Sequence, residues 1–295
     1  MTIRVFSALF LVALLPGCAA LGLGDDDDKD VTVTYAAEVL ENYRNGMEEL
    51  WDENYLEARK FMEHVRNNFQ FSKYAVLAEL RLADADFGRS KYAEAFDGYT
   101  LFRKFHPNHP AAGYAAYKAA LSFYEEMPSN WFFMPPPEER DQAPIRRAAQ
   151  YFQRYVEEYG AMADLPEGQQ KVAPDAEGEW DIMVGEEQRF SEADRLASAN
   201  SKLSEVRRRL ADHEMYVAEF YLRVDKPKAA VARLEGLLDK FNGVGLDIEA
   251  LELLAETYLD MEDKPKARRT YERLLADFPG DPAAEDAREF LQENP

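Results

Sequence analysis

The chain has 295 residues, and its 35 basic and 56 acidic side chains give a formal net charge of −21 at pH 7. That charge repels phosphate backbones, so nucleic acid is excluded as an expected partner. A single cysteine leaves no intramolecular disulfide and no cysteine-rich metal site, whereas 46% apolar residues suffice for a core.

The first 17 residues have the layout of a secretory signal. Arg4 is the one cation before an almost wholly apolar run at residues 5–15, which is too short to span a membrane. The end of this run, "LPGC", resembles the lipobox of bacterial lipoproteins. We therefore expect residues 1–17 to be a lipoprotein signal peptide and Cys18 to be the lipid-carrying first residue of the mature protein. Residues 18–34 read as a flexible acidic tether.

The rest of the chain repeats with a period of 37 residues. "DKPKA" at 225–229 returns at 263–267, and Ala58 to Ala95 spans the same interval as Ala230 to Ala267. A small residue lies twelve positions before each of these alanines, an apolar side chain four after it in each unit, and a proline closes some units. This resembles the tetratricopeptide (TPR) pattern and predicts stacked helical hairpins.

The predicted fold is therefore all-α, a TPR-type helical-hairpin solenoid of about five repeats with a C-terminal capping helix. Its expected units are residues 35–70, 71–107, 108–160, 190–242 and 243–280, with a cap at 281–295. Residues 127–142 are proline-rich and predict a loop inside the third pair, and 190–223 predict a long helix. Residues 161–189 show no helical period and read as an inserted surface loop.

No catalytic constellation is found in the sequence. His106 and His109 could pair as metal ligands, but they lie at a helix-to-helix turn without a third ligand nearby. His213-Glu214 lacks the second histidine of a zinc-protease helix, since Val217 occupies its place. We therefore expect a binding scaffold rather than an enzyme, with no metal and no cofactor beyond the covalent lipid on Cys18.

Three stretches resemble one family. "FQFSKYA" at 69–75 and "FHPNHP" at 105–110 are similar to the first repeat junctions of BamD proteins, and "RLADHEMYVAEFY" at 209–221 is similar to their fourth repeat. The resemblance implies an outer-membrane lipoprotein, facing the periplasm, in the β-barrel assembly (BAM) complex. Its implied partners are a BamA-like barrel protein, other BAM lipoproteins and unfolded β-barrel clients. The alternative is another envelope TPR lipoprotein adaptor, of the cell-division or pilus-assembly type.

The resemblance also implies two sites. The family's contact with BamA falls on the arginine that opens "RLADHE", so Arg207, Arg208, Arg209 and Glu214 are the expected docking residues. Local pairing with Glu205 or Asp212 is the competing interpretation. Phe71 and Tyr74 are the expected client-peptide groove, and burial between repeats is the competing interpretation for both. In the groove interpretation, Tyr74→Ala leaves stability nearly unchanged.

Overall fold

The computed structural model describes residues 32–127, 135–163 and 192–293, and within these ranges all regular structure is helical. Cys18, the signal segment, nearly all of the tether and most of the 161–189 insertion lie outside the described residues. The helices are α1 (Val39–Trp51), α2 (Tyr55–Asn68), α3 (Lys73–Gly88), α4 (Tyr92–Phe105), α5 (Ala112–Glu125), the 3₁₀ helix η2 (Pro137–Glu139), α6 (Ala143–Ala163), α7 (Glu192–Arg223), α8 (Pro227–Lys240), α9 (Asp247–Asp260), α10 (Lys264–Asp277) and α11 (Ala283–Glu293).

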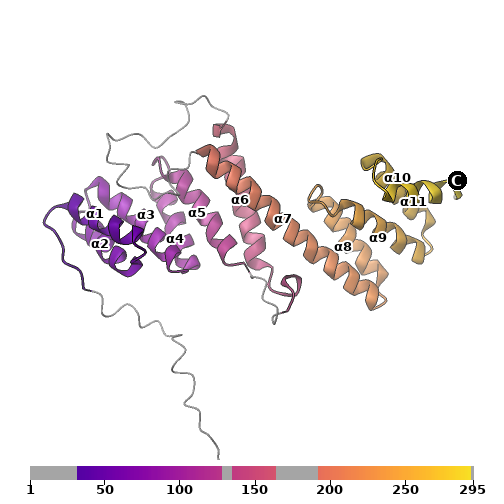
Figure 1. Ribbon diagram of the computed structural model, residues 1–295, viewed down its shortest axis with the longest axis horizontal. Helices are drawn as coiled ribbons and strands as arrows, with labels where there is room; N and C mark the ends of the chain where they lie inside the picture. The colour runs from indigo at the N-terminus through magenta and orange to yellow at the C-terminus, as the bar shows by residue number, and fades with distance from the viewer. Residues whose placement is uncertain (1–31, 128–134, 164–191, 294–295) are drawn as a thin grey trace, which may run out of the picture.

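Each helix packs against the next one in the chain, and the pairs follow one another along the long axis of the molecule (Figure 1). First helices of neighbouring pairs also meet, as α1 does with α3 and α5 with α7. No single pair can bury its own apolar face, so stacking supplies the core. This arrangement confirms the prediction of an all-α, TPR-type solenoid with a closing helix, α11.

The residues that defined the repeat lie where paired helices pack closely. The alanines at 58, 95, 148, 230 and 267 are all fully buried. A Cβ on Gly46 would lie 2.9 Å from the Cβ of Phe61 and 2.8 Å from the Cε of Met62, so α1 approaches α2 too closely for a side chain there. Gly98 makes the same kind of approach to Ala83. Small residues therefore set the distance between paired helices.

The two long interruptions are attached to the longest helices. α6 has 21 residues and α7 has 32, and they pack against each other. α6 continues to Ala163, three residues into the range that the sequence assigned to the insertion. The reason is intrinsic propensity, since residues 161–163 are Ala, Met and Ala, which are strong helix formers. The loop predicted at 127–142 contains η2 in its described part.

The segment before α1 is held against the first repeat. Asn42 is fully buried, donates from Nδ2 to the carbonyl oxygens of Ala36 (2.7 Å) and Glu38 (3.0 Å), and accepts from the Ala36 N–H at 2.9 Å. The Tyr35 ring stacks on His64 of α2 with a centroid distance of 4.0 Å. The chain is therefore fixed to the solenoid from about residue 35 onward.

The core changes character along the array. At the N-terminal end, the fully buried Arg81 lies 2.6 Å from Asp84, which also accepts from the hydroxyls of Tyr99 and Tyr114 at 2.7 Å each. The C-terminal core is built chiefly from leucine and alanine of α8 to α11. Among the described residues, no helix is long and apolar enough to cross a membrane.

Candidate partner-binding surfaces

The three arginines of the expected docking site lie in the middle of α7 and face different neighbours. Arg207 donates to the carbonyl oxygen of Lys240 at 3.2 Å. Arg208 pairs with Asp212 at 2.9 Å and donates to the Gly245 carbonyl oxygen at 3.0 Å. Both side chains therefore reach the turn that joins α8 to α9, and they tie α7 to that turn.

Arg209 faces α5 instead. It pairs with Glu205 at 2.8 Å, and Glu205 also accepts from the hydroxyl of Tyr124 at 2.5 Å. Burial and the bond to Glu205 raise the pKa of Tyr124 to about 12. Burial disfavours the charged form of Glu205, but the bonds from Tyr124 and Arg209 outweigh it and lower the pKa of its carboxyl. Arg209 thus has the local partner of the competing interpretation, although about a third of its side chain stays exposed.

The remainder of the "RLADHE" stretch holds neighbouring segments in place. His213 contacts the backbone carbonyl oxygen of Glu138 in η2 through Nδ1 (2.6 Å), and the hydroxyl of Tyr216 donates to the carboxylate of Glu139. Glu214, which the sequence placed in the docking site, accepts from Arg233 of α8 at 3.0 Å. This stretch therefore joins α7 to η2 and to α8.

The two aromatic residues expected in a client groove differ sharply in exposure. Phe71 is fully exposed in the turn before α3, whereas Tyr74 is only 6% exposed. Ser72 caps α3 by accepting the Tyr74 N–H at 3.1 Å, and the Tyr74 ring then turns onto Tyr43 of α1 with centroids 5.4 Å apart. The expectation that Tyr74 is an open groove residue is wrong, because the helix start directs it into the core.

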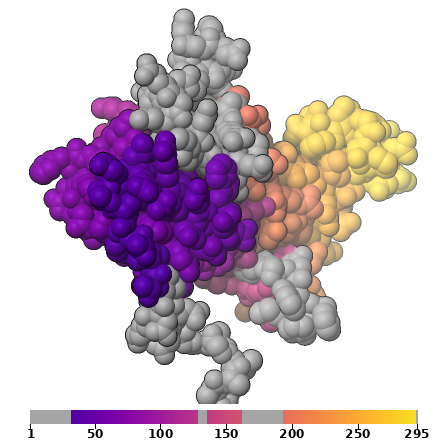
Figure 2. All heavy atoms as spheres, turned by 60° about the vertical axis from the view of Figure 1, so that its left-hand side comes forward, coloured from indigo at the N-terminus to yellow at the C-terminus, as the bar shows by residue number. Residues whose placement is uncertain are grey.

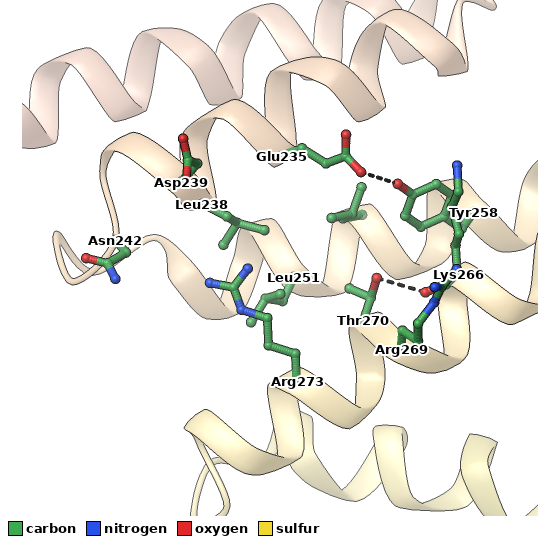
Figure 3. A pocket seen from close by; sticks show the side chains of 11 residues that line it. Glu235, Leu238, Asp239, Asn242, Leu251, Tyr258, Lys266, Arg269, Thr270 and Arg273 are labelled. Carbon is green, nitrogen blue, oxygen red and sulfur yellow. Dashed lines mark hydrogen bonds between the residues drawn. The ribbon is translucent and has the colours of Figure 1, made fainter.

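A further concave site lies at the C-terminal end, where a groove of about 620 Å³ runs between α8 and α10 with α9 at its base (Figure 3). Its α8 wall carries Glu235 and Asp239 and its α10 wall carries Lys266, Arg269 and Arg273. Glu235 accepts from the Tyr258 hydroxyl at 2.6 Å, and burial together with that bond raises the Tyr258 pKa. The groove therefore has walls of opposite charge.

Sequence reasoning missed this groove. The signal was available in part, because α10 carries five cations and two acidic residues in a strongly acidic chain, and three of those cations recur at intervals of three and four positions. That spacing places them on one face of a helix. What the sequence did not indicate is that α8 would present carboxylates across from them.

The fold and these surfaces define a class of protein, a helical-hairpin solenoid that exposes charged and aromatic side chains. Within the described ranges, no group of three or more His, Cys, Asp or Glu side chains is placed to hold a metal ion. The chain belongs to the YfiO family of outer membrane lipoproteins, which it matches over residues 36–163 and 188–274. The unmatched stretch between them falls within the predicted insertion. The family is the one that the three sequence stretches resembled.

Similar proteins include outer membrane protein assembly factor BamD from three bacteria. The chain is 25% identical to the Caulobacter vibrioides protein over 289 residues, covering 98% of this chain and 80% of that protein. It is 25% identical to the Neisseria gonorrhoeae protein over 95% of this chain and 92% of that one. The Rickettsia prowazekii protein is 22% identical, with 94% and 92% covered.

Among solved structures, a thermophilic TPR protein of Thermus thermophilus aligns over 86% of this chain and 100% of its own. The sequence identity is 13% and the TM-score is 0.30. The fold assignment rests on the helix packing described above and not on this alignment.

Proposed function

We propose that this outer membrane lipoprotein is a non-catalytic scaffold of the β-barrel assembly machinery, which binds a BamA-like barrel protein and helps β-barrel proteins to assemble and insert. The observation that carries the proposal is the family match over both halves of the solenoid, together with near full-length similarity to proteins named as outer membrane protein assembly factor BamD. Other lipoproteins of the complex are further proposed partners.

The membrane attachment is proposed at Cys18. The contacts of Tyr35 and Asn42 hold the chain to the first repeat from about residue 35. About 17 residues separate Cys18 from that point, and a flexible coil of this length would reach roughly 20–25 Å. The first repeat is therefore held close to the membrane surface. Cys18→Ala should leave an unprocessed precursor and release the mature domain from membranes, as measured by fractionation. Normal processing and retention of this variant in the outer membrane would contradict the anchor.

The proposed docking surface for the BamA-like partner is the exposed side of the arginines at 207–209. Arg208 and Arg209 each pair with an acidic side chain, whereas the one bond that Arg207 makes within the described residues is to a carbonyl oxygen. Arg207 therefore keeps its positive charge uncompensated, in a chain of net charge −21. An acidic surface on the partner would complement it.

The docking experiment uses membranes solubilised in detergent, with the lipidated chain as bait and an antibody to the BamA-like protein as readout. Arg207→Glu and Arg209→Glu should each reduce capture by roughly tenfold or more, since breaking a buried interfacial charge pair costs several kcal/mol. Arg223→Glu is the matched control, because it makes the same charge change at the exposed end of α7. Capture by the wild-type chain of a cell-division or pilus protein in place of the BamA-like protein would overturn the proposed function.

Phe71 is the proposed contact for unfolded clients, since its ring is fully exposed at a repeat turn. Phe71→Ala should weaken binding of a peptide with a C-terminal aromatic residue while leaving the melting temperature unchanged. Leu101→Ala is the control, because Leu101 is also an exposed apolar residue but lies on α4 and not in that turn. Equal loss of peptide binding in both variants would remove Phe71 from the site.

A further inference from the structure

The α8–α10 groove has features that the proposed scaffold role does not use. On its basic wall, Lys266, Arg269 and Arg273 are all exposed. Their spacing of three and then four residues places them on one face of α10, along about 10 Å of helix. The Arg273 side chain reaches from α10 toward α8 (Figure 3). The cations thus form a row that faces into the groove.

These cations are only weakly engaged by the chain itself. Arg269 donates through Nε to the carbonyl oxygen of Pro265, and Arg273 touches Asp277 through Nε at 3.3 Å. Lys266 lies 3.5 Å from Asp263 and 5.0 Å from the centre of the Tyr258 ring. No ion pair crosses the groove between the described residues of the two walls. Arg269 and Arg273 use only Nε in these contacts, so the terminal N–H groups of both guanidinium groups remain available to a ligand.

The opposite wall restricts what can lie there. Glu235 is engaged with the Tyr258 hydroxyl, and Asp239 is exposed near the Asn242 end of the groove. A ligand with carboxylates on every side would be repelled by this wall. A ligand with carboxylates on one side and hydrogen-bond donors on the other satisfies both walls.

An extended peptide has that two-sidedness. Side chains alternate between the two faces of a strand, so every second residue points the same way, about 6.6 Å apart. Two or three carboxylates on one face therefore match the row of α10 cations, which spans about 10 Å. At one end of the groove, Asn242 belongs to the turn between α8 and α9. Arg208 contacts the same turn at Gly245, and Arg207 contacts the carbonyl oxygen of Lys240 just before it.

We propose that the α8–α10 groove is a second docking site, which binds an extended segment of a partner protein with acidic residues at alternate positions. The proposal rests on the proposed scaffold function for the identity of the partner as a member of the same assembly, but its chemistry follows from the groove alone. The carboxylates of that segment face Lys266, Arg269 and Arg273, and its intervening polar side chains face Glu235 and Asp239. In Figure 2 the C-terminal helices project away from the N-terminal repeats, which leaves α10 uncovered by them on that side.

The test uses the full mature chain and a fluorescent twelve-residue peptide of alternating Glu and Ser, with binding followed by anisotropy. A peptide of the same composition with all Glu residues in one block is the pattern control, and alternating Gln and Ser is the charge control. The wild-type chain should bind the alternating Glu peptide at least tenfold more tightly than either control. Equal binding of the alternating and blocked peptides would overturn the proposed geometry.

The variants separate the groove from general electrostatics. Arg269→Glu with Arg273→Glu should reduce binding of the alternating Glu peptide at least tenfold, whereas Asp239→Lys should strengthen it. Lys264→Glu with Arg268→Glu makes the same charge change on α10 outside the groove and should leave binding within about twofold. An equal loss in both double variants would overturn the site, and circular dichroism establishes that each variant is folded.

Two further readouts distinguish the alternatives. Vesicles of phosphatidylglycerol test a lipid surface as the occupant. Suppose that the wild-type chain binds the vesicles, that Arg269→Glu with Arg273→Glu abolishes this binding, and that the alternating peptide is not preferred over its controls. That result would overturn the proposal of a protein partner. Capture of the BamA-like protein is measured on the same variants. If the wild-type chain does not capture the BamA-like protein, the proposed function fails. Peptide binding by the purified chain tests the groove independently of that result.

Discussion

The two ends of the solenoid use the same repeat geometry but hold it together differently. In the N-terminal repeats, Asp84 joins the buried Arg81 to hydroxyls from α4 and α5, and Arg81 also donates to Tyr43 of α1 at 3.2 Å. The buried threonines of the C-terminal repeats bond within their own helix, as Thr257 does to the Leu253 carbonyl oxygen, and the Tyr258 hydroxyl donates to the exposed Glu235 of α8. Charges there lie mainly on the surface. A polar network therefore fixes one end, and apolar packing forms the other.

The network also changes the protonation of its members. Burial, followed by the charge of Asp84 and Tyr114 and the bond to Asp84, raises the pKa of Tyr99 well above its usual value. Burial likewise raises the pKa of Tyr43, although Arg81 opposes it. Both phenols therefore stay protonated at neutral pH, where Tyr99 donates to Asp84 and Tyr43 accepts from Arg81. A network of this kind is specific when complete and unfavourable when one member is lost.

The substitution expected to have the largest effect on the difference between the two ends is Asp84→Ala. It leaves the guanidinium of Arg81 buried without its carboxylate, and breaking a buried pair in this way costs about 3–5 kcal/mol. We expect that loss in the free energy of unfolding, measured by urea denaturation. The C-terminal counterpart is Glu272→Ala, which removes an exposed pair with Arg268 and should cost about 1 kcal/mol or less. Equal losses in the two variants would contradict the comparison.

The sequence predicted the repeat but not this network. The 37-residue spacing and the small residues indicated which positions would be buried, because close helix packing needs small side chains at fixed intervals. Arg81 and Asp84 show no such signal, since a charged residue on a helix is most often solvated. Their burial depends on four helices meeting, with tyrosines from three of them turned toward one point.

A smaller effect comes from two glycines at opposite ends. Gly46→Ala should destabilise the protein by about 1–3 kcal/mol, because its new Cβ would press on Phe61 and Met62. Gly236→Ala should stabilise it by about 1 kcal/mol, since a Cβ at that position in α8 meets nothing within 4 Å and alanine is the better helix former. Thermal unfolding of both variants gives the signs. A stabilising Gly46→Ala would mean that α1 and α2 are not in close contact.

Some features of the candidate sites could be predicted from the sequence, and others could not. The sequence placed Phe71 at a repeat turn and the arginines on a long helix, but it left open whether Phe71 would be exposed. The burial of Tyr74 does not, because it depends on how α3 begins after the Ser72 cap. The groove depends on α8 and α10 lying across α9, a relation between residues some 30 positions apart. Local patterns indicate faces of elements, and only the packing shows which faces oppose each other.

The smallest expected effect is a pH dependence at the C-terminal end. Burial, and then the charges of Glu256, Asp281, Asp286 and Glu249, raise the pKa of Glu252 on α9. Its folded-state pKa therefore lies above its unfolded value, and stability falls as the pH rises through that window, since the folded state holds the proton more tightly. At neutral pH the charged Glu252 is a cost to the fold.

Glu252→Gln removes that cost and should raise the melting temperature at pH 7 by on the order of 1 °C. The gain should vanish below about pH 4, where both states are protonated in the wild-type chain. Glu293→Gln, at the exposed end of α11, is a control in which the cluster stays intact. The measurement is the difference in melting temperature between variant and wild type from about pH 3 to about pH 8. A difference that grows toward acid would have the opposite sign and would show that these five carboxylates do not repel one another in the folded protein.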